Sequence, residues 1–126
     1  MTTNATVLLV DDDKDILETV DRILYHYGIR AITANNVFEA MSKFIANENI
    51  IDLIITDIHM PDGSGKDLIS WIKSITTTPV LALTACEEEV NATKMMKPFN
   101  IDDFIILVKR MIIDNVVRQE EQVALF

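Results

Sequence analysis

Five side chains that could do chemistry follow directly after short apolar runs of the sequence: Asp11, Asp12, Asp57, Thr84 and Lys97. Carboxylates gathered in one place raise each other's pKa unless a cation neutralises them. Mg²⁺ suits such a set, because it prefers oxygen ligands and is usually held by one or two carboxylates. A hydroxyl and an ammonium suit the oxygens of a phosphoryl group, and a carboxylate can be phosphorylated to an aspartyl phosphate. Taken alone, Asp57 could equally cap a turn.

Whether these groups meet depends on the elements that carry them. Apolar runs predict strands at 6–10, 29–34, 50–57, 80–83 and 92–96. Helical spacing predicts four helices. The first covers 14–27, with Gly28 at its C′ position, and the second begins after Asn35 or Asn36. The third runs from near Gly65 to a break at 76–79, and the fourth begins at Asn100. The second and third helices have predicted apolar faces of Val37, Ala40, Met41, Phe44 and Ile45, and of Leu68, Ile69, Ile72 and Ile75.

Strands and helices thus alternate along the chain, which predicts an α/β fold with a doubly wound, five-stranded parallel sheet. In the flavodoxin-like strand order 2-1-3-4-5, ligands bind beyond the carboxyl ends of the first and third strands. That order would place Asp11, Asp12 and Asp57 around one crevice. Thr84 and Lys97, which end the fourth and fifth strands, would face the same edge.

Composition limits the function classes further. The chain has 126 residues, which fits one domain, and a net charge of −9, with eleven basic residues among twenty acidic ones. Direct nucleic-acid binding is not expected, because a phosphate backbone requires clustered Lys and Arg. The single cysteine permits no internal disulfide. Residues Met1–Asn4 lack the basic and apolar regions with which a signal peptide begins, and the apolar runs are too short to span a bilayer. We therefore expect a cytoplasmic protein without membrane contact.

The motifs at 7–13, 52–65, 83–85 and 97–99 resemble those of the receiver domain of two-component response regulators, and the resemblance covers essentially the whole chain. It implies that Asp57 accepts phosphate from a histidine of a sensor kinase or phosphotransfer protein. It also implies that Asp12 binds Mg²⁺ directly, Asp11 does so mostly through water, and the backbone carbonyl of His59 is a further ligand. Thr84 and Lys97 would contact the phosphoryl oxygens, and the Lys97–Pro98 peptide would be cis.

The sequence departs from this family in two places. Lys97 comes only 13 positions after Thr84, so the fourth helix is expected to be shortened or absent. The family's aromatic switch position, three residues before the lysine, is occupied by Lys94. Residues 118–126 are expected to extend the last helix or to fray, and the apolar residues there could form a homodimer or another partner contact.

The predicted function is a single-domain receiver, 1–126, that acts through protein contacts because no output domain follows. It would be no enzyme beyond self-phosphorylation from phosphodonors and slow loss of the phosphate. One alternative is a pseudo-receiver, an interaction module that never carries phosphate. Another is a Mg²⁺-dependent phosphohydrolase with an aspartyl nucleophile, although such enzymes usually have an acid two residues after the nucleophile, where this chain has His59.

Overall fold

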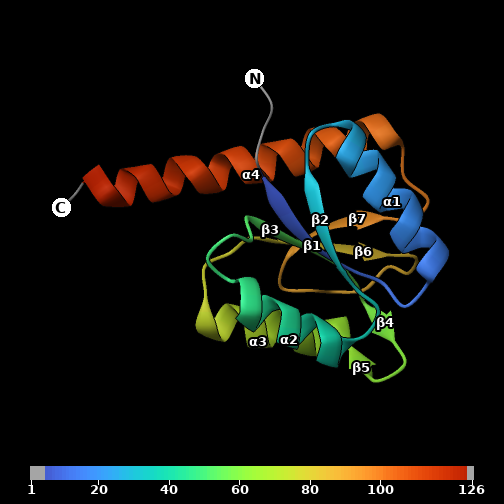
Figure 1. The fold of residues 1–126 in the computed structure, drawn as a ribbon. Helices are drawn as coiled ribbons and strands as arrows, with labels where there is room; N and C mark the ends of the chain where they lie inside the picture. The colour runs from blue at the N-terminus through green and yellow to red at the C-terminus, as the bar shows by residue number, and fades with distance from the viewer. Residues whose placement is uncertain (1–4, 125–126) are drawn as a thin grey trace.

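Five parallel strands form the central sheet, in the order β2-β1-β3-β6-β7 (Figure 1). The computed structural model describes residues 5–124, with side chains up to residue 121. The strands are β1 (Thr6–Val10), β2 (Arg30–Ala34), β3 (Leu53–Asp57), β6 (Val80–Thr84) and β7 (Thr93–Met96). Counted along the chain, this is the predicted order 2-1-3-4-5, so the expected doubly wound α/β fold is confirmed.

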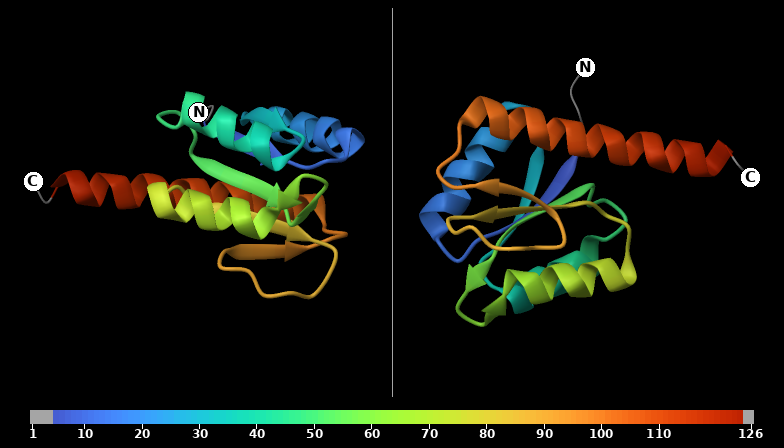
Figure 2. Two further views of the ribbon diagram at one scale, coloured as in Figure 1. Left: turned by 90° about the horizontal axis from the view of Figure 1, so that it is seen from below. Right: turned by 180° about the vertical axis from the view of Figure 1, so that it is seen from behind.

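Helices cover both faces of the sheet (Figures 1 and 2). On one face lie α1 (Lys14–His26) and α4 (Ile101–Ala124), and on the other lie α2 (Val37–Asn47) and α3 (Gly65–Ile75). Successive strand residues point to opposite faces. Val7 and Leu9 therefore belong to the core under α1 and α4, whereas Leu8 and Val10 belong to the core under α2 and α3. Because both faces are covered, the central strands are apolar at nearly every position.

The helix ends show why the chain turns where it does. Asn36 begins α2 by accepting a hydrogen bond from the Glu39 N–H at 2.7 Å, and Asn100 accepts from the N–H groups of Asp102 and Asp103 at the start of α4. Such caps satisfy backbone donors that have no partner within the helix. Gly28, after α1, has a φ of 78°, the left-handed conformation that favours glycine at this position.

Three details of the predicted elements were wrong. The third strand begins at Leu53 rather than at Ile50, which is exposed, because Asp52 joins the start of β1 through two hydrogen bonds with the backbone of Thr6. Ile45 and Ile75 are also exposed rather than part of the apolar faces. Ile45 is turned by about 100° from the buried Phe44, and Ile75 is the last residue of α3.

A short hairpin that the sequence analysis did not predict follows β3. It pairs β4 (His59–Met60) with β5 (Gly63–Ser64) in antiparallel fashion, and the turn between them contains Asp62. The Asp62 carboxylate accepts hydrogen bonds from the N–H groups of Val37 and Phe38 at the start of α2. The hairpin therefore links the chain after Asp57 to a neighbouring helix.

Between β6 and β7 the chain forms no helix, which confirms that the fourth helix expected of a receiver is lost. Residues 85–92, here called the crossover segment, make this connection instead. Lys94 holds it in place, because its Nζ donates to the backbone oxygen of Glu88 at 2.9 Å and to the Glu87 carboxylate at 3.2 Å. Val90 and Ala92 pack against the core under α2 and α3. The crossover segment thus covers part of the face that a helix would cover.

The last helix is longer than the sheet that it covers. α4 has 24 residues, or about 36 Å, and its C-terminal end, where residues 116–121 are all exposed, extends past the strands (Figures 1 and 2). The helix continues through Ala124; the predicted tail residues Leu125 and Phe126 and the predicted start Met1–Asn4 lie outside the described residues. Within residues 5–124, no helix combines the length and the apolar character needed to cross a bilayer.

Candidate functional site

Three carboxylates meet at the carboxyl edge of the sheet, where β1 and β3 lie side by side. Asp57 is the last residue of β3, and Asp11 and Asp12 directly follow β1. One carboxylate oxygen from each lies within 4.8 Å of the other two. Asp11 is buried, Asp12 is exposed, and Asp57 is partly buried. The arrangement is therefore open on one side, and it could hold a cation with oxygen ligands.

Lys97 brings a positive charge into the same place from the end of β7. Its Nζ lies 3.2 Å from Asp11 Oδ2 and 3.6 Å from Asp57 Oδ2. Its backbone N–H donates to the carbonyl oxygen of Thr84 at 2.8 Å, which holds the lysine against the end of β6. The peptide that follows, Lys97–Pro98, is cis, as the family resemblance implied.

The pKa of Asp11 is raised above its ordinary value. Burial is the largest cause, and the charge of Asp57 acts in the same direction. The hydrogen bond from the Asp13 N–H and the charge of Lys97 act in the opposite direction without cancelling the rise. Lys97 and the Asp13 N–H thus do not offset the burial of Asp11 and the charge of Asp57, and a cation bound beside these carboxylates would favour their charged forms.

Backbone contacts hold the Asp57 side chain in place. The N–H of Ile58 donates to Asp57 Oδ1 at 2.7 Å, while Oδ2 is the oxygen near Lys97. Gly65 presses against the same turn, since its N–H donates to the Ile58 carbonyl at 2.6 Å. A Cβ atom on Gly65 would lie 2.1 Å from the Asp57 carbonyl oxygen. Only glycine permits this close approach of α3 to the end of β3.

Thr84 is placed on the neighbouring strand, but its hydroxyl is engaged elsewhere. Leu83 of β6 pairs with Asp57 of β3, so Thr84 lies one residue further along its strand than the partner of Asp57. Its hydroxyl donates to the Cys86 carbonyl at 3.0 Å and accepts from the Cys86 N–H at 3.2 Å. The structure therefore brings four of the five predicted side chains into one cluster and leaves the Thr84 hydroxyl bonded to the crossover segment.

The sequence analysis missed a second cluster, which borders the first. Glu88 of the crossover segment lies 2.9 Å from His59 Nε2, 3.3 Å from Lys66 Nζ and 3.5 Å from the Thr84 hydroxyl. Burial would raise the pKa of Glu88, but the contacts with Lys66 and His59 outweigh it, so this pKa is lowered. No spacing in the sequence relates Glu88 to Lys66, because only the path of a helix-free connection brings them together.

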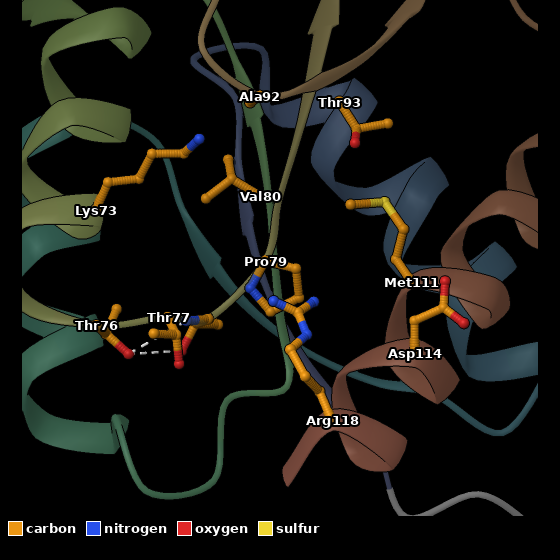
Figure 3. A pocket seen from close by; sticks show the side chains of 11 residues that line it. Lys73, Thr76, Thr77, Pro79, Val80, Ala92, Thr93, Met111, Asp114 and Arg118 are labelled. Atoms are coloured by element: carbon orange, nitrogen blue, oxygen red, sulfur yellow. Dashed lines mark hydrogen bonds between the residues drawn. The ribbon is translucent and has the colours of Figure 1, made fainter. Parts of the chain in front are cut away.

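A cavity of about 420 Å³ lies at the opposite end of the strands (Figure 3). Its walls include Val80 and Thr93, the first residues of β6 and β7, together with Lys73 of α3 and Arg118 of α4. The full length of the strands separates it from Asp57. It is therefore not part of the carboxylate site.

Comparison with known proteins identifies the family. The family profile named "Response regulator receiver domain" matches residues 7–118. The chain belongs to this family. Receiver domains are signalling switches and in general not enzymes, and the domain therefore belongs to phosphorelay signalling of the two-component type.

Individual proteins and a solved structure that resemble this receiver domain agree with the family assignment. It is 31% identical over 115 residues to the "Transcriptional regulatory protein CpxR homolog" of Haemophilus influenzae, which covers 84% of this chain and 49% of that protein. It is 33% identical over 114 residues to the "Regulatory protein VanRB" of Enterococcus faecalis, covering 83% and 50%. The chain spans about half the length of these two relatives. The receiver domain structure from Clostridium thermocellum has a TM-score of 0.78 at 30% identity and covers 94% of this chain and 98% of its own.

Proposed function

We propose that this receiver domain is a phosphorelay switch that accepts a phosphoryl group on Asp57 in a Mg²⁺-dependent reaction. The observation that carries the proposal is the position of Lys97 Nζ, 3.2 Å from Asp11 and 3.6 Å from Asp57. A carboxylate with an ammonium beside it and two further acids at hand is suited to receive a phosphoryl group. The donor would be a histidine of a sensor kinase or of a phosphotransfer protein, in keeping with the family.

In the proposed reaction, a carboxylate oxygen of Asp57 forms the bond to phosphorus, and the bond from phosphorus to the donor nitrogen breaks. The Ile58 N–H holds Oδ1, which leaves Oδ2 on the side of Lys97 as the attacking oxygen. The ammonium of Lys97 would stabilise the negative charge on the phosphoryl oxygens. The Thr84 hydroxyl would then leave the Cys86 carbonyl and donate to one of these oxygens, which would change the position of the crossover segment.

The residues present fit a Mg²⁺ ion. Asp11, Asp12 and Asp57 offer hard oxygen ligands within 4.8 Å of one another, and one exposed member leaves access for water and phosphate. We assign Asp12 and Asp57 as direct ligands, Asp11 as a ligand mostly through water, and the His59 backbone carbonyl as the remaining protein ligand. Bound Mg²⁺ would neutralise the acids and the incoming phosphoryl group.

The output would be a protein contact in the cytoplasm rather than binding to nucleic acid. The net charge of −9 supports this, because it repels a phosphate backbone. The partner that reads the phosphorylated state would meet a surface that has the crossover segment in place of a helix and Lys94 in place of an aromatic residue. This surface predicts a downstream partner different from those of receivers with the usual helix.

Intact-mass spectrometry after incubation with acetyl phosphate tests the proposal. With Mg²⁺ the parent should gain one phosphoryl group, and it should gain none when the metal is chelated. Asp57→Asn should gain none, whereas Asp62→Asn, a matched change five residues away, should still be phosphorylated. A parent that gains no mass from acetyl phosphate or from a phosphorylated histidine phosphotransfer protein would favour the pseudo-receiver. Continuous turnover of a small phosphoester, lost in Asp57→Asn, would favour the phosphohydrolase.

A further inference from the structure

The outer side of α4 has an apolar stripe that nothing in the described chain covers. Ile106, Ile113 and Val117 are 56%, 58% and 46% exposed, although large aliphatic side chains are usually buried. With about 100° between successive helical residues, the three point in nearly the same direction. The buried residues Phe104 and Val108 lie about half a turn away, on the side that packs on the sheet. A partner on this stripe would therefore not compete with the domain's own core.

Two charged residues complete the stripe to a regular repeat. Arg110 and Glu120 are exposed and lie between and beyond the apolar residues. The five positions 106, 110, 113, 117 and 120 have alternating spacings of four and three residues. This is the repeat of the two seam positions in a coiled coil, where one helix packs along another. The stripe is thus shaped to pair with a second helix rather than with a compact ligand.

The free length of α4 makes such a pairing accessible. The C-terminal end of the helix extends past the sheet (Figures 1 and 2), and residues 116–121 are all exposed. If a second α4 lies antiparallel on the stripe, the domain that carries it lies at the other end of the helix pair and on its opposite side. The two domains would then not collide, because each lies on the outer side of its own α4.

The order of apolar and charged residues along the stripe favours a second, antiparallel copy of α4 as the partner helix. If a second copy of α4 lies antiparallel with its centre at position 115, Ile113 of one copy faces Val117 of the other, and Arg110 faces Glu120. Apolar residues then meet apolar ones, and each seam cation meets a seam anion. In a parallel pair in register, Arg110 of one copy would face Arg110 of the other, and Glu120 would face Glu120. Like charges that face each other at a seam are unfavourable.

We infer that the domain forms a symmetric dimer through an antiparallel pair of α4 helices, centred at position 115, with Ile113 opposite Val117 and Arg110 opposite Glu120. The contact is isologous, since both copies contribute the same patch. It does not depend on phosphorylation of Asp57, so its test and that of the proposed function can fail separately. The dimer would place the two carboxylate sites on opposite sides of the helix pair.

Sedimentation of the unphosphorylated full chain over a range of concentrations tests the association. The parent should sediment as a dimer, and Ile113→Glu should raise the dissociation constant by roughly tenfold or more, because it removes an apolar contact and adds a charge at the centre. Ile45→Glu is the matched control, since Ile45 is 62% exposed on α2 and lies outside the stripe. It should leave the dimer unchanged. A parent that remains monomeric, or an equal effect of both variants, overturns the inference.

Charge reversal tests the orientation. Arg110→Glu and Glu120→Arg should each weaken the dimer, because each places like charges face to face, and the double variant should restore it. Arg118→Glu, the same charge change on the same helix outside the seam, should have little effect. In a parallel dimer, either single reversal would leave like charges facing like and change nothing. Single variants that dimerise as well as the parent would therefore exclude the antiparallel arrangement.

Discussion

Glu88 Oε1 lies 2.9 Å from His59 Nε2 and thereby ties the crossover segment to the residue two positions after Asp57. The other Glu88 oxygen lies 3.3 Å from Lys66 at the start of α3. In the absence of a helix between β6 and β7, the polar attachments that position the segment are these contacts, those of Lys94 with Glu87 and Glu88, and those of Thr84 with Cys86. The Glu88 carboxylate takes part in three contacts, with His59, Lys66 and Thr84, so the segment's order should depend strongly on it.

The first prediction follows from this attachment. Glu88→Gln should speed amide hydrogen exchange in residues 85–92 several-fold while leaving the strands protected, because local opening needs only the polar attachments to break. Hydrogen-exchange mass spectrometry measures this directly. Glu89→Gln is the control, since Glu89 is an exposed acid of the same segment that takes part in none of these attachments. Equal exchange in the parent and Glu88→Gln would show that the packing of Val90 and Ala92 holds the segment instead.

A second prediction concerns the turn after Asp57. Gly65→Ala should destabilise the domain by about 1–3 kcal/mol, the usual cost of inserting atoms into a filled site, because the new Cβ would lie 2.1 Å from a backbone oxygen. Elsewhere in a helix, replacing glycine by alanine would instead be stabilising. Urea unfolding measures the difference. Gly63→Ala is the matched control, because its Cβ would meet only the Val37 side chain, with Cγ2 nearest at 3.4 Å, and no comparable loss is expected there.

The third prediction is a pH dependence from Asp62. Hydrogen bonds from Phe38 and Val37 lower the pKa of this carboxylate below its ordinary value of 3.8. An acid whose pKa is lower in the folded state stabilises the fold above its unfolded pKa, and this contribution is lost as the pH falls through the folded pKa. From near pH 3.8 downward, the parent should therefore lose more of its free energy of unfolding than Asp62→Asn does.

Thermal unfolding at several pH values tests this difference. Asp67→Asn, which removes an exposed acid in the first turn of α3, should retain the acid sensitivity of the parent. If the parent and Asp62→Asn lose stability in parallel below that pH, the link between the hairpin and α2 does not contribute to the pH dependence.

The fourth prediction concerns the metal. Mg²⁺ should raise the free energy of unfolding by about 2.7 kcal/mol when its concentration is one hundred times the dissociation constant, as for any ligand that binds only the folded state. The expected rise in melting temperature should disappear in Asp12→Asn, a change at an exposed position that leaves the core intact. Glu18→Gln removes another exposed acid, on α1, and should keep the full effect. A rise that persists in Asp12→Asn would place the bound Mg²⁺ elsewhere.

The sequence alone was sufficient for the fold and for most of the carboxylate site. Continuous apolar runs that end in Asp11, Asp57 and Thr84 predicted buried parallel strands, and parallel strands bring their carboxyl ends to one edge. The short interval from Thr84 to Lys97 predicted the missing helix correctly. These properties follow from the local order of apolar and polar residues, which is readable without coordinates.

Other features depended on contacts between distant parts of the chain. Ile45 and Ile75 fit an apolar face by spacing, but both are exposed, because Ile45 is turned by about 100° from the buried Phe44 and Ile75 is the last residue of α3. The Glu88 contacts with His59 and Lys66 depend on the path of a segment that has no periodicity of its own. A repeating element orients its side chains through its own hydrogen bonds, so its pattern can be predicted from the sequence, whereas an irregular connection takes its position only from the surfaces it packs against.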